Sequence, residues 1–302
     1  MKHAITVLLV AACLAGCTSR PEVNGARAHA RVVQQVNLGP RIPGSEGHRV
    51  FREWLIAELG NLGARVETQS FEDTVAGEPQ TIVNVIARWG PRAGRPILLC
   101  AHYDTRARAD RDPDRPGEPV PGANDGASGV AVLLEVAELM RIQPPPRAVE
   151  LAFFDAEDQG RDDTPETWSR GAHAYARTLA PRLENRTAPV AGFLFDMVGD
   201  RDLNIHPEIT SVRRASNIAA LVLDAAAATG ARHFHETPKY AVMDDHIPIL
   251  DAGVPCVDVI DFDYAAWHTT ADTPDMVSPE SLAEVARVAA WLVYESPLAR
   301  SR

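Results

Sequence analysis

Short apolar runs alternate with helix-like segments along most of this chain, and this alternation constrains the fold more than any other feature. The runs are predominantly apolar and do not alternate apolar with polar positions, which is typical of parallel strands buried on both faces. They lie at residues 97–101, 148–154, 190–195 and 254–260. Segments with apolar residues at helical spacing flank them, at residues 44–62, 126–140, 169–179, 212–229 and 278–294. The order predicts one α/β domain with a mostly parallel, mixed central sheet and helices on both faces.

Local signals refine this prediction. Residues 81–89 and 95–102 are predicted to form two neighbouring strands, and residues 106–122, rich in Pro, Asp and Arg, a surface loop. Ser278 and Pro279 are typical of the N-cap and first position of a helix. Cys100 and Cys256 lie in strand-like runs, so buried free thiols are favoured, although one disulfide between them stays open.

The first seventeen residues are predicted to be an export signal. Lys2 precedes a short apolar stretch at residues 4–12, and Leu14-Ala15-Gly16-Cys17 resembles a bacterial lipobox. We expect cleavage before Cys17, lipidation of its thiol, a tether over residues 18–26 and a single catalytic domain over residues 27–300. The mature protein would be a membrane-anchored lipoprotein on the periplasmic or cell-surface side. An ordinary signal peptide, with Cys17 incidental, is the alternative.

The charge balance excludes one class of partner. The formal net charge is −11 and the isoelectric point is near 5.4, which argues against a nucleic-acid surface. These values do not identify a substrate. No segment after the signal is apolar enough to span a bilayer.

Histidines and carboxylates follow several of the predicted strands. The carboxyl ends of parallel strands meet at one crevice, so side chains placed there converge. The candidates are His102, Asp104, Asp125, Glu157, Asp158, Asp196 and His268. Nitrogen and oxygen ligands of this kind suit zinc, and the pattern predicts a zinc enzyme. Taken singly, His102 could be a hydrogen-bonded structural residue, Asp125 a helix N-cap, and residues 155–158 a solvated acidic loop.

The order of these residues resembles the M28 family of zinc aminopeptidases and, within it, the animal-type glutaminyl cyclases. The resemblance covers nearly the whole mature chain. It is carried by residues 41–45 (RIPGS), 84–86 (NVI), 102–104 (HYD), 122–125 (GAND), 153–158 (FFDAED), 195–196 (FD), 244–248 (DDHIP) and 267–269 (WHT). The fold it implies is the α/β/α sandwich of the zinc aminopeptidases.

The resemblance also implies roles for individual residues. The family's metal ligands fall on His102, Asp125, Asp158, Asp196 and His268. In two-zinc peptidases Asp125 would bridge the ions, whereas in cyclases one zinc would use Asp125, Asp158 and His268. The proton-shuttling carboxylate falls on Glu157. In the cyclase, Asp244 would stabilise the tetrahedral intermediate and, with Asp196, hold Glu157 in place.

Two features favour the cyclase branch. The two acids of Asp244-Asp245-His246 match the cyclase pattern, and Trp267 resembles an aromatic residue that lines the cyclase pocket, although it could instead be a core residue. Trp168 lies five residues from the expected position of the second pocket tryptophan, and Asp158 is one methylene shorter than the usual glutamate. We therefore expect a zinc-dependent glutaminyl-peptide cyclotransferase acting on peptide or protein N-termini. A two-zinc aminopeptidase and a non-catalytic tethered binding module are the alternatives.

Overall fold

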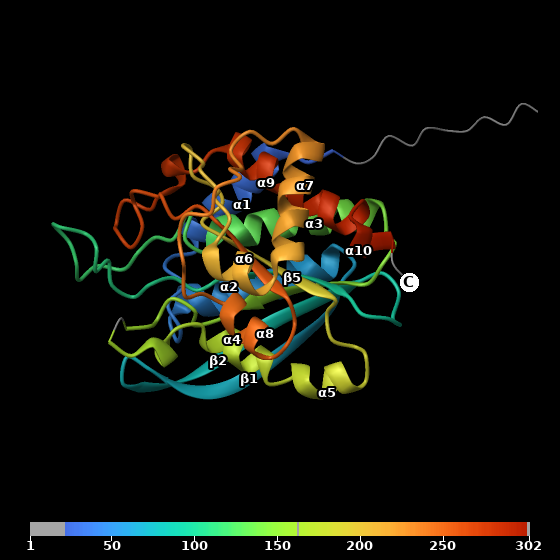
Figure 1. Ribbon diagram of the computed structural model, residues 1–302. Helices are drawn as coiled ribbons and strands as arrows, with labels where there is room; N and C mark the ends of the chain where they lie inside the picture. The colour runs from blue at the N-terminus through green and yellow to red at the C-terminus, as the bar shows by residue number, and fades with distance from the viewer. Residues whose placement is uncertain (1–21, 162, 301–302) are drawn as a thin grey trace, which may run out of the picture.

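A single six-stranded sheet forms the centre of the computed structural model, which describes residues 22–161 and 163–300 (Figure 1). The strands are β1 (Arg65–Val75), β2 (Glu78–Trp89), β3 (Ile97–His102), β4 (Val149–Phe154), β5 (Ala191–Asp196) and β6 (Cys256–Ile260). Their order across the sheet is β1-β2-β4-β3-β5-β6. The neighbours β4, β3, β5 and β6 are parallel, and β2 runs antiparallel to both β1 and β4. The predicted mixed, mostly parallel sheet is confirmed.

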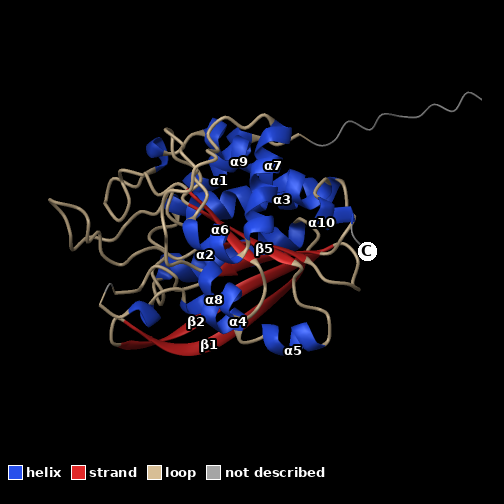
Figure 2. Cartoon of the chain, in the orientation of Figure 1, coloured by secondary structure: helices blue, strands red, loops and turns tan. Residues whose placement is uncertain are grey.

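Helices cover both faces of this sheet (Figure 2). One layer contains α1 (Gly25–Asn37), α3 (Ala127–Ile142), α6 (Ile209–Arg214), α7 (Ser216–Thr229) and α9 (Pro279–Tyr294). The other contains α2 (Glu46–Asn61), α4 (Arg170–Ala176) and α8 (His246–Asp251). The short helices α5 (Leu179–Glu184) and α10 (Pro297–Arg300) lie at the periphery, and η1 (Pro165–Thr167) and η2 (Pro274–Met276) are single 3₁₀ turns. All six residues of β3, β4 and β5 are buried, as expected for strands covered on both faces.

Capping residues set several helix ends where the sequence predicts them. The Ser278 side chain accepts a hydrogen bond from the Ser281 N–H, and Pro279 occupies the first helical position of α9. Ser45 caps α2 in the same way, and Gly230 ends α7 in the left-handed conformation that glycine adopts without strain.

Four predictions of local structure are wrong in part. β2 and β3 are not neighbours, because β4 lies between them. The helix predicted over residues 212–229 is two helices, since the chain leaves helical geometry at Ala215 between α6 and α7. The helix predicted over residues 169–179 ends at Ala176, and α5 begins at Leu179. The strand β1 was missed because it is an edge strand with mostly exposed or half-buried side chains, so its apolar signal is weak.

The N-terminal predictions lie mostly outside the described residues, which begin at residue 22. The signal, Cys17 and most of the tether are therefore predictions still. The first helix, α1, begins at Gly25, two residues before the expected start of the domain. Cys100 and Cys256 are buried free thiols, as favoured. Within residues 22–161 and 163–300, no helix is both long and apolar enough to cross a membrane.

Candidate active site

The predicted site residues converge at the carboxyl ends of the parallel strands. His102 is the last residue of β3 and Asp196 the last of β5, so these adjacent strands place the two side chains together. Glu157 and Asp158 follow β4, and His268 lies in the segment after β6. Asp125 comes just before α3. All of these residues are at most 8% exposed.

One group of candidate ligands surrounds His102. Its Nε2 lies 3.2 Å from Asp125 Oδ1 and 3.1 Å from Asp196 Oδ1. Its Nδ1 lies 3.5 Å from Asp104 Oδ1, so Asp104 orients the ring from behind, as the sequence predicts.

A second group surrounds His268. Its Nε2 lies 3.0 Å from Asp158 Oδ1 and 3.7 Å from Asp125 Oδ2. Its Nδ1 lies 3.3 Å from Asp110 Oδ1. Asp125 thus directs one oxygen toward each imidazole, which is the arrangement that a bridging carboxylate needs.

The donor set fits zinc. In each group one nitrogen and two carboxylate oxygens lie within 4.8 Å of one another, and all are buried. Both oxygens of Asp158 lack a hydrogen-bond partner in the part of the chain that the structure describes. The His268 ring is its close charged neighbour, and a cation held between nitrogen and oxygen ligands would supply the coordination that these buried oxygens lack in hydrogen bonds.

The alternatives for single residues are decided by these positions. The N-cap of α3 is Gly126, and Asp125 makes no side-chain capping bond because it faces the imidazoles. The segment after β4 is not a solvated acidic loop, since Glu157 and Asp158 are 7% and 1% exposed. Asp155 has a different role from these two. It accepts hydrogen bonds from the Val83 N–H and pairs with His48 Nε2 at 2.8 Å, on the far side of the loop.

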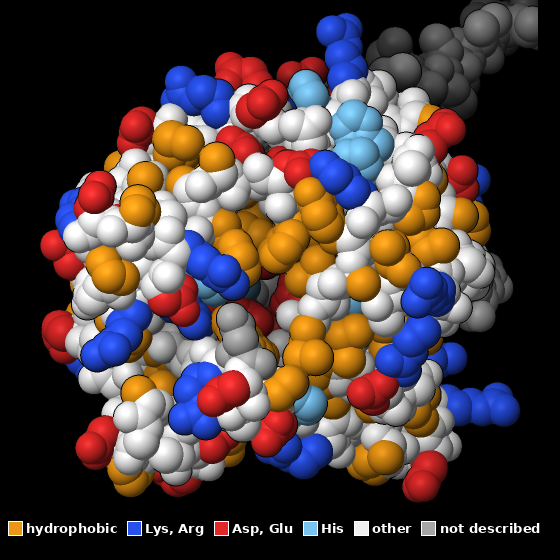
Figure 3. Space-filling view, turned by 60° about the vertical axis from the view of Figure 1, so that its left-hand side comes forward, with side chains coloured by type: hydrophobic (Ala, Val, Ile, Leu, Met, Phe, Trp, Pro, Cys, Tyr) orange, Lys and Arg blue, Asp and Glu red, His pale blue; other side chains and the backbone are white. Residues whose placement is uncertain are grey.

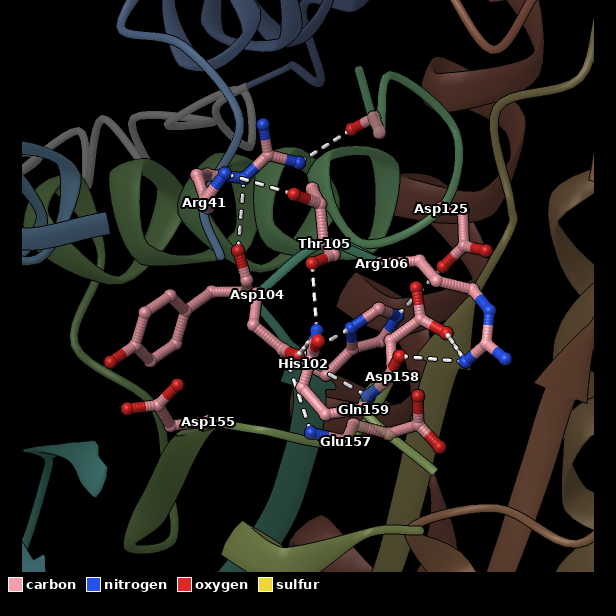
Figure 4. A network of polar contacts seen from close by, with 12 residues as sticks. Arg41, His102, Asp104, Thr105, Arg106, Asp125, Asp155, Glu157, Asp158 and Gln159 are labelled. Carbon is pink, nitrogen blue, oxygen red and sulfur yellow. Dashed lines mark hydrogen bonds and ion pairs between the residues drawn. The ribbon is translucent and has the colours of Figure 1, made fainter. Parts of the chain in front are cut away.

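Asp104 fixes the loop that contains Glu157 and Asp158. Its two oxygens accept the backbone N–H groups of Glu157 at 3.0 Å and Asp158 at 3.2 Å. Gln159 adds a third bond through Nε2 at 3.0 Å. Figure 4 shows these contacts, with Asp155 turned away from them. The same carboxylate therefore orients His102 and holds the catalytic loop.

Backbone strain gathers around the site. Ala156, Ser169, Met197 and His268 have φ angles between 46° and 55°, in the left-handed region that side chains other than glycine rarely adopt. Ala156 precedes Glu157, and Met197 follows Asp196. Such conformations persist where surrounding contacts impose them, and they are concentrated at functional sites.

Glu157 is in an environment suited to proton transfer. Burial raises the pKa of its carboxyl well above the ordinary value, the charge of His102 opposes this rise, and the charge of Asp244 adds to it. Its Oε1 accepts a long hydrogen bond from Ser169 Oγ at 3.4 Å. Positive charge on a bound cation would oppose this rise of the Glu157 pKa.

A cavity of about 210 Å³ opens beside the second ligand group. Its wall combines candidate ligands, acids and apolar side chains: Asp125, Glu157, Asp158, Trp168, Asp196, Met197, Ala241, Val242, Met243, Asp244, Ile260, Phe262, Trp267 and His268. Figure 3 shows the hollow, with acidic side chains inside and hydrophobic ones on its rim. The Trp168 ring lies nearly parallel to the His268 ring, with 6.1 Å between the ring centroids. The Trp267 ring centroid lies 4.1 Å from that of His268.

Three residues that support the ligands were missed from the sequence. Arg106 donates to the Asp158 carbonyl at 2.9 Å and lies over the Trp168 ring, and it also pairs with Asp110. Asp272 accepts the backbone N–H groups of residues 124 and 125 at 2.8 and 3.1 Å. No local signal marks Arg106 or Asp110 within their Pro- and Arg-rich loop, whereas the position of Asp272, four residues after His268, was a usable hint.

Comparison with known proteins agrees with this geometry. The profile of peptidase family M28 matches residues 84–293. A glutaminyl-peptide cyclotransferase-like protein of Mus musculus is 30% identical over 281 residues, covering 84% of this chain and 72% of its own. The crystal structure of Bacteroides thetaiotaomicron glutaminyl cyclase bound to N-acetylhistamine superposes with a TM-score of 0.86 at 31% identity, over 91% of this chain and 99% of that one. The structure of a Zn-dependent exopeptidase from Parabacteroides distasonis superposes with a TM-score of 0.87 at 32% identity. The match covers 92% of this chain and 100% of that one. By its sequence, its fold and the placement of these residues, the chain belongs to peptidase family M28, in the glutaminyl cyclase branch.

Proposed function

We propose that this enzyme is a glutaminyl-peptide cyclotransferase, which converts an N-terminal glutamine into pyroglutamate with loss of ammonia. The observation that carries the proposal is the composition of one cavity. Glu157, the ligand group of His268, and both Trp168 and Trp267 line it together. A cavity of this kind can enclose one glutamine residue between aromatic walls and place it against a proton-transferring carboxylate.

In this reaction the α-amine of the substrate attacks the carbon of its own side-chain amide, and the carbon–nitrogen bond to the amide nitrogen breaks. Zinc, when bound by Asp125, Asp158 and His268, supplies a Lewis acid that polarises the amide carbonyl. Glu157 accepts a proton from the attacking amine and delivers it to the leaving nitrogen, which departs as ammonia. A proton shuttle of this kind contributes roughly 10²–10⁴-fold to the rate.

Asp244 lines the same cavity and is assigned a hydrogen-bonding role. Burial raises the pKa of its carboxyl well above the ordinary value, and the charge of Asp196 adds to the rise. From its place in the cavity wall, Asp244 can hydrogen-bond to the tetrahedral intermediate. Trp168 and Trp267 exclude water from the reacting atoms and hold the folded conformer of the substrate that permits ring closure.

A two-zinc aminopeptidase is the second candidate, and the His102 group is the observation that favours it. His102, Asp125 and Asp196 form a second complete set of nitrogen and oxygen donors. In that case Glu157 would act as general base for water, and the first peptide bond would break. Occupancy of the His102 group by zinc therefore separates the two candidates. The similar proteins described above are named as glutaminyl cyclases or as a zinc exopeptidase, which are enzymes. We therefore do not retain the non-catalytic binding module.

The test is mass spectrometry of a Gln-Xaa-Xaa peptide incubated with the purified, zinc-loaded protein. Loss of ammonia from an intact peptide is the expected result. Release of free glutamine with addition of water would replace the proposal by the aminopeptidase. A peptide with N-terminal asparagine is the matched control, because its shorter side chain would require a four-membered ring, and it should be unchanged.

We further propose that the enzyme is exported and anchored to the outer side of a membrane through lipidated Cys17. The lipobox-like sequence before Cys17 supports this, and the substrates would then be peptide or protein N-termini outside the cytoplasm. Metabolic labelling with a radioactive fatty acid should label the wild type, and Cys17→Ala should abolish the label. Labelling that persists in this variant would refute anchoring at Cys17.

A further inference from the structure

A third group of histidine and carboxylate side chains lies behind the catalytic cavity. Asp244 and His246 flank the start of α8, and Asp258 lies in the middle of β6. One ligand atom from each lies within 4.8 Å of the other two, and the three residues are 3%, 0% and 4% exposed. Asp244 also lines the catalytic cavity, so this group borders the active site but lies deeper in the fold.

The third group repeats the pattern of the first two. In the groups of His102 and His268, one ring nitrogen faces two candidate ligand carboxylates, and the other faces a supporting carboxylate at 3.3–3.5 Å. In the third group His246 Nδ1 lies 3.8 Å from Asp258 Oδ2, and His246 Nε2 lies 3.3 Å from Glu208 Oε2. Histidine ligands of metals characteristically have such a carboxylate behind the ring, because it fixes the tautomer and orientation.

The candidate ligand atoms of this group lack hydrogen bonds. Both ring nitrogens of His246, both oxygens of Asp258 and Oδ2 of Asp244 make no hydrogen bond within the described parts of the chain. No lysine or arginine there forms an ion pair with Asp244 or Asp258 either. Buried polar atoms are satisfied in the great majority of cases, so several orphaned atoms directed at one point call for a bound species.

We propose that Asp244, His246 and Asp258 bind one divalent cation of the zinc or manganese type. Two carboxylates and one imidazole are ligands that such cations accept, and a three-residue set leaves room for water to complete the coordination. Two bonds of about 2.1 Å hold their ligand atoms at most about 4.2 Å apart, so the 3.8 Å between His246 and Asp258 suits a shared ion.

The third group also borders a second, smaller cavity. Glu208 and Asp258 line this space of about 20 Å³, which is enough for a water molecule. A cation held here would fix the carboxylate of Asp244 at the wall of the active site. The alternative is that protons neutralise the group: burial, together with the charge of Asp244, raises the pKa of Asp258 well above its ordinary value.

The experiment is anomalous diffraction from crystals of the full chain grown with zinc, measured above and below the zinc absorption edge. We expect a peak enclosed by Asp244, His246 and Asp258, separate from any peak at His268. A filled catalytic site with no peak in the third group would overturn the proposal and leave shared protons as the explanation. The measurement needs no turnover, so its failure is distinct from failure of the cyclase assignment.

Zinc per chain in solution gives a second readout. Elemental analysis after equilibration with limiting free zinc should find one zinc fewer in Asp258→Asn than in the wild type. The matched control is Asp251→Asn, which changes an exposed carboxylate at the other end of α8 and should bind as the wild type does. Equal zinc in Asp258→Asn and the wild type would contradict the proposal, even with a peak in crystals. If Asp258→Asn does not fold, the anomalous map of the wild type decides alone.

Discussion

The two candidate ligand groups that share Asp125 are built in different ways. The His102 group is made by the sheet: His102 and Asp196 end adjacent parallel strands, and the supporting carboxylate, Asp104, follows β3 by two residues. The His268 group is made by loops, since Asp158, His268 and the supporting Asp110 all lie outside helices and strands. Strand ends place side chains through backbone pairing, whereas loops need specific contacts to do the same.

Those contacts are present around His268. The loop at residues 106–122 bonds to the His268 segment through the Arg111 N–H, which donates to the His268 carbonyl at 3.2 Å. Arg41, fully buried, donates to the carbonyls of Tyr103 at 2.9 Å and Gly122 at 2.6 Å, so it ties both ends of this loop to the core. The imidazole that lines the cavity, His268, is therefore the one that loops hold, and its placement depends on residues outside the candidate ligand set.

Removal of each histidine ligand is the strongest test of the difference between the two groups. In a cyclase that leaves the His102 group empty, His268→Ala should lose the zinc of the His268 group and activity together, whereas His102→Ala should keep that zinc and much of its turnover. Elemental analysis and the pyroglutamate assay measure both quantities. If His102→Ala also loses activity completely, and the wild type binds two zinc ions in these groups, the His102 group is a working metal site and the aminopeptidase assignment gains.

Glu157→Gln tests the chemistry that the two groups serve. The variant keeps the shape of the side chain and removes its proton-accepting ability, so turnover should fall by roughly 10²–10⁴-fold while zinc content stays unchanged. Glu166→Gln, in the exposed 3₁₀ turn near the cavity, is the matched control and should behave as the wild type does. Full activity in Glu157→Gln would remove the proton shuttle from the mechanism.

The sequence predicts the sheet-built half of the site better than the loop-built half. His102 and Asp196 directly follow apolar strands, and parallel strands must end at a common edge, so their meeting follows from strand assignment alone. Strand order does not follow so directly, because the runs at 81–89 and 95–102 are consecutive in sequence while long-range pairing places β4 between them. The edge strand β1 was missed for the same reason, because its pairing with β2 stabilises it and its own side chains are mostly not buried.

In the loop-built half, the sequence predicts the candidate ligands but not the residues that hold them in place. Asp158 and His268 were candidates because they follow predicted strands, the resemblance to a known family supplied their roles and Trp267, and the structure brings the three together. Asp110 and Arg106 could not be found, because a surface loop rich in charge has no periodic signal and their role depends on contacts with residues far along the chain. Adjacent acids were also indistinguishable by sequence, although Asp155 faces His48 and Asp158 faces His268.

Asp110→Asn tests whether the loop supports the His268 group as the structure indicates. Loss of the carboxylate behind His268 Nδ1 should weaken zinc binding by about 10–100-fold, the usual effect of removing such a partner. Turnover at saturating zinc should change less than the zinc affinity. Asp114→Asn is the control, because Asp114 is exposed in the same loop and its side chain contacts no ligand. Equal zinc affinity in Asp110→Asn, Asp114→Asn and the wild type would show that the ligands hold themselves in place.

The smallest expected effect is a proton released when zinc binds. In the metal-free protein burial opposes the charged form of His268, but the charge of Asp158 and the bond to Asp110 outweigh it and raise its pKa to about 9. Burial and the charge of Asp125 raise the pKa of Asp158 to about 6, so at pH 7 it is mostly ionised while His268 is protonated. Zinc needs the neutral ring, so binding at pH 7 should release about one proton, and affinity should rise about tenfold per pH unit up to pH 9.

Calorimetry in two buffers of different ionisation enthalpy measures that proton directly. The metal-free protein should show the opposite trend in stability, because the raised pKa of His268 adds to the unfolding free energy below its unfolded pKa, about 6.5, and this contribution is lost as the pH rises through about 9. Asp110→Asn removes one of the partners that raise this pKa, so its proton release at pH 7 should be smaller than that of the wild type. A release that is zero in the wild type would mean that His268 is neutral before zinc arrives, and that the loop holds the ring in place without charging it.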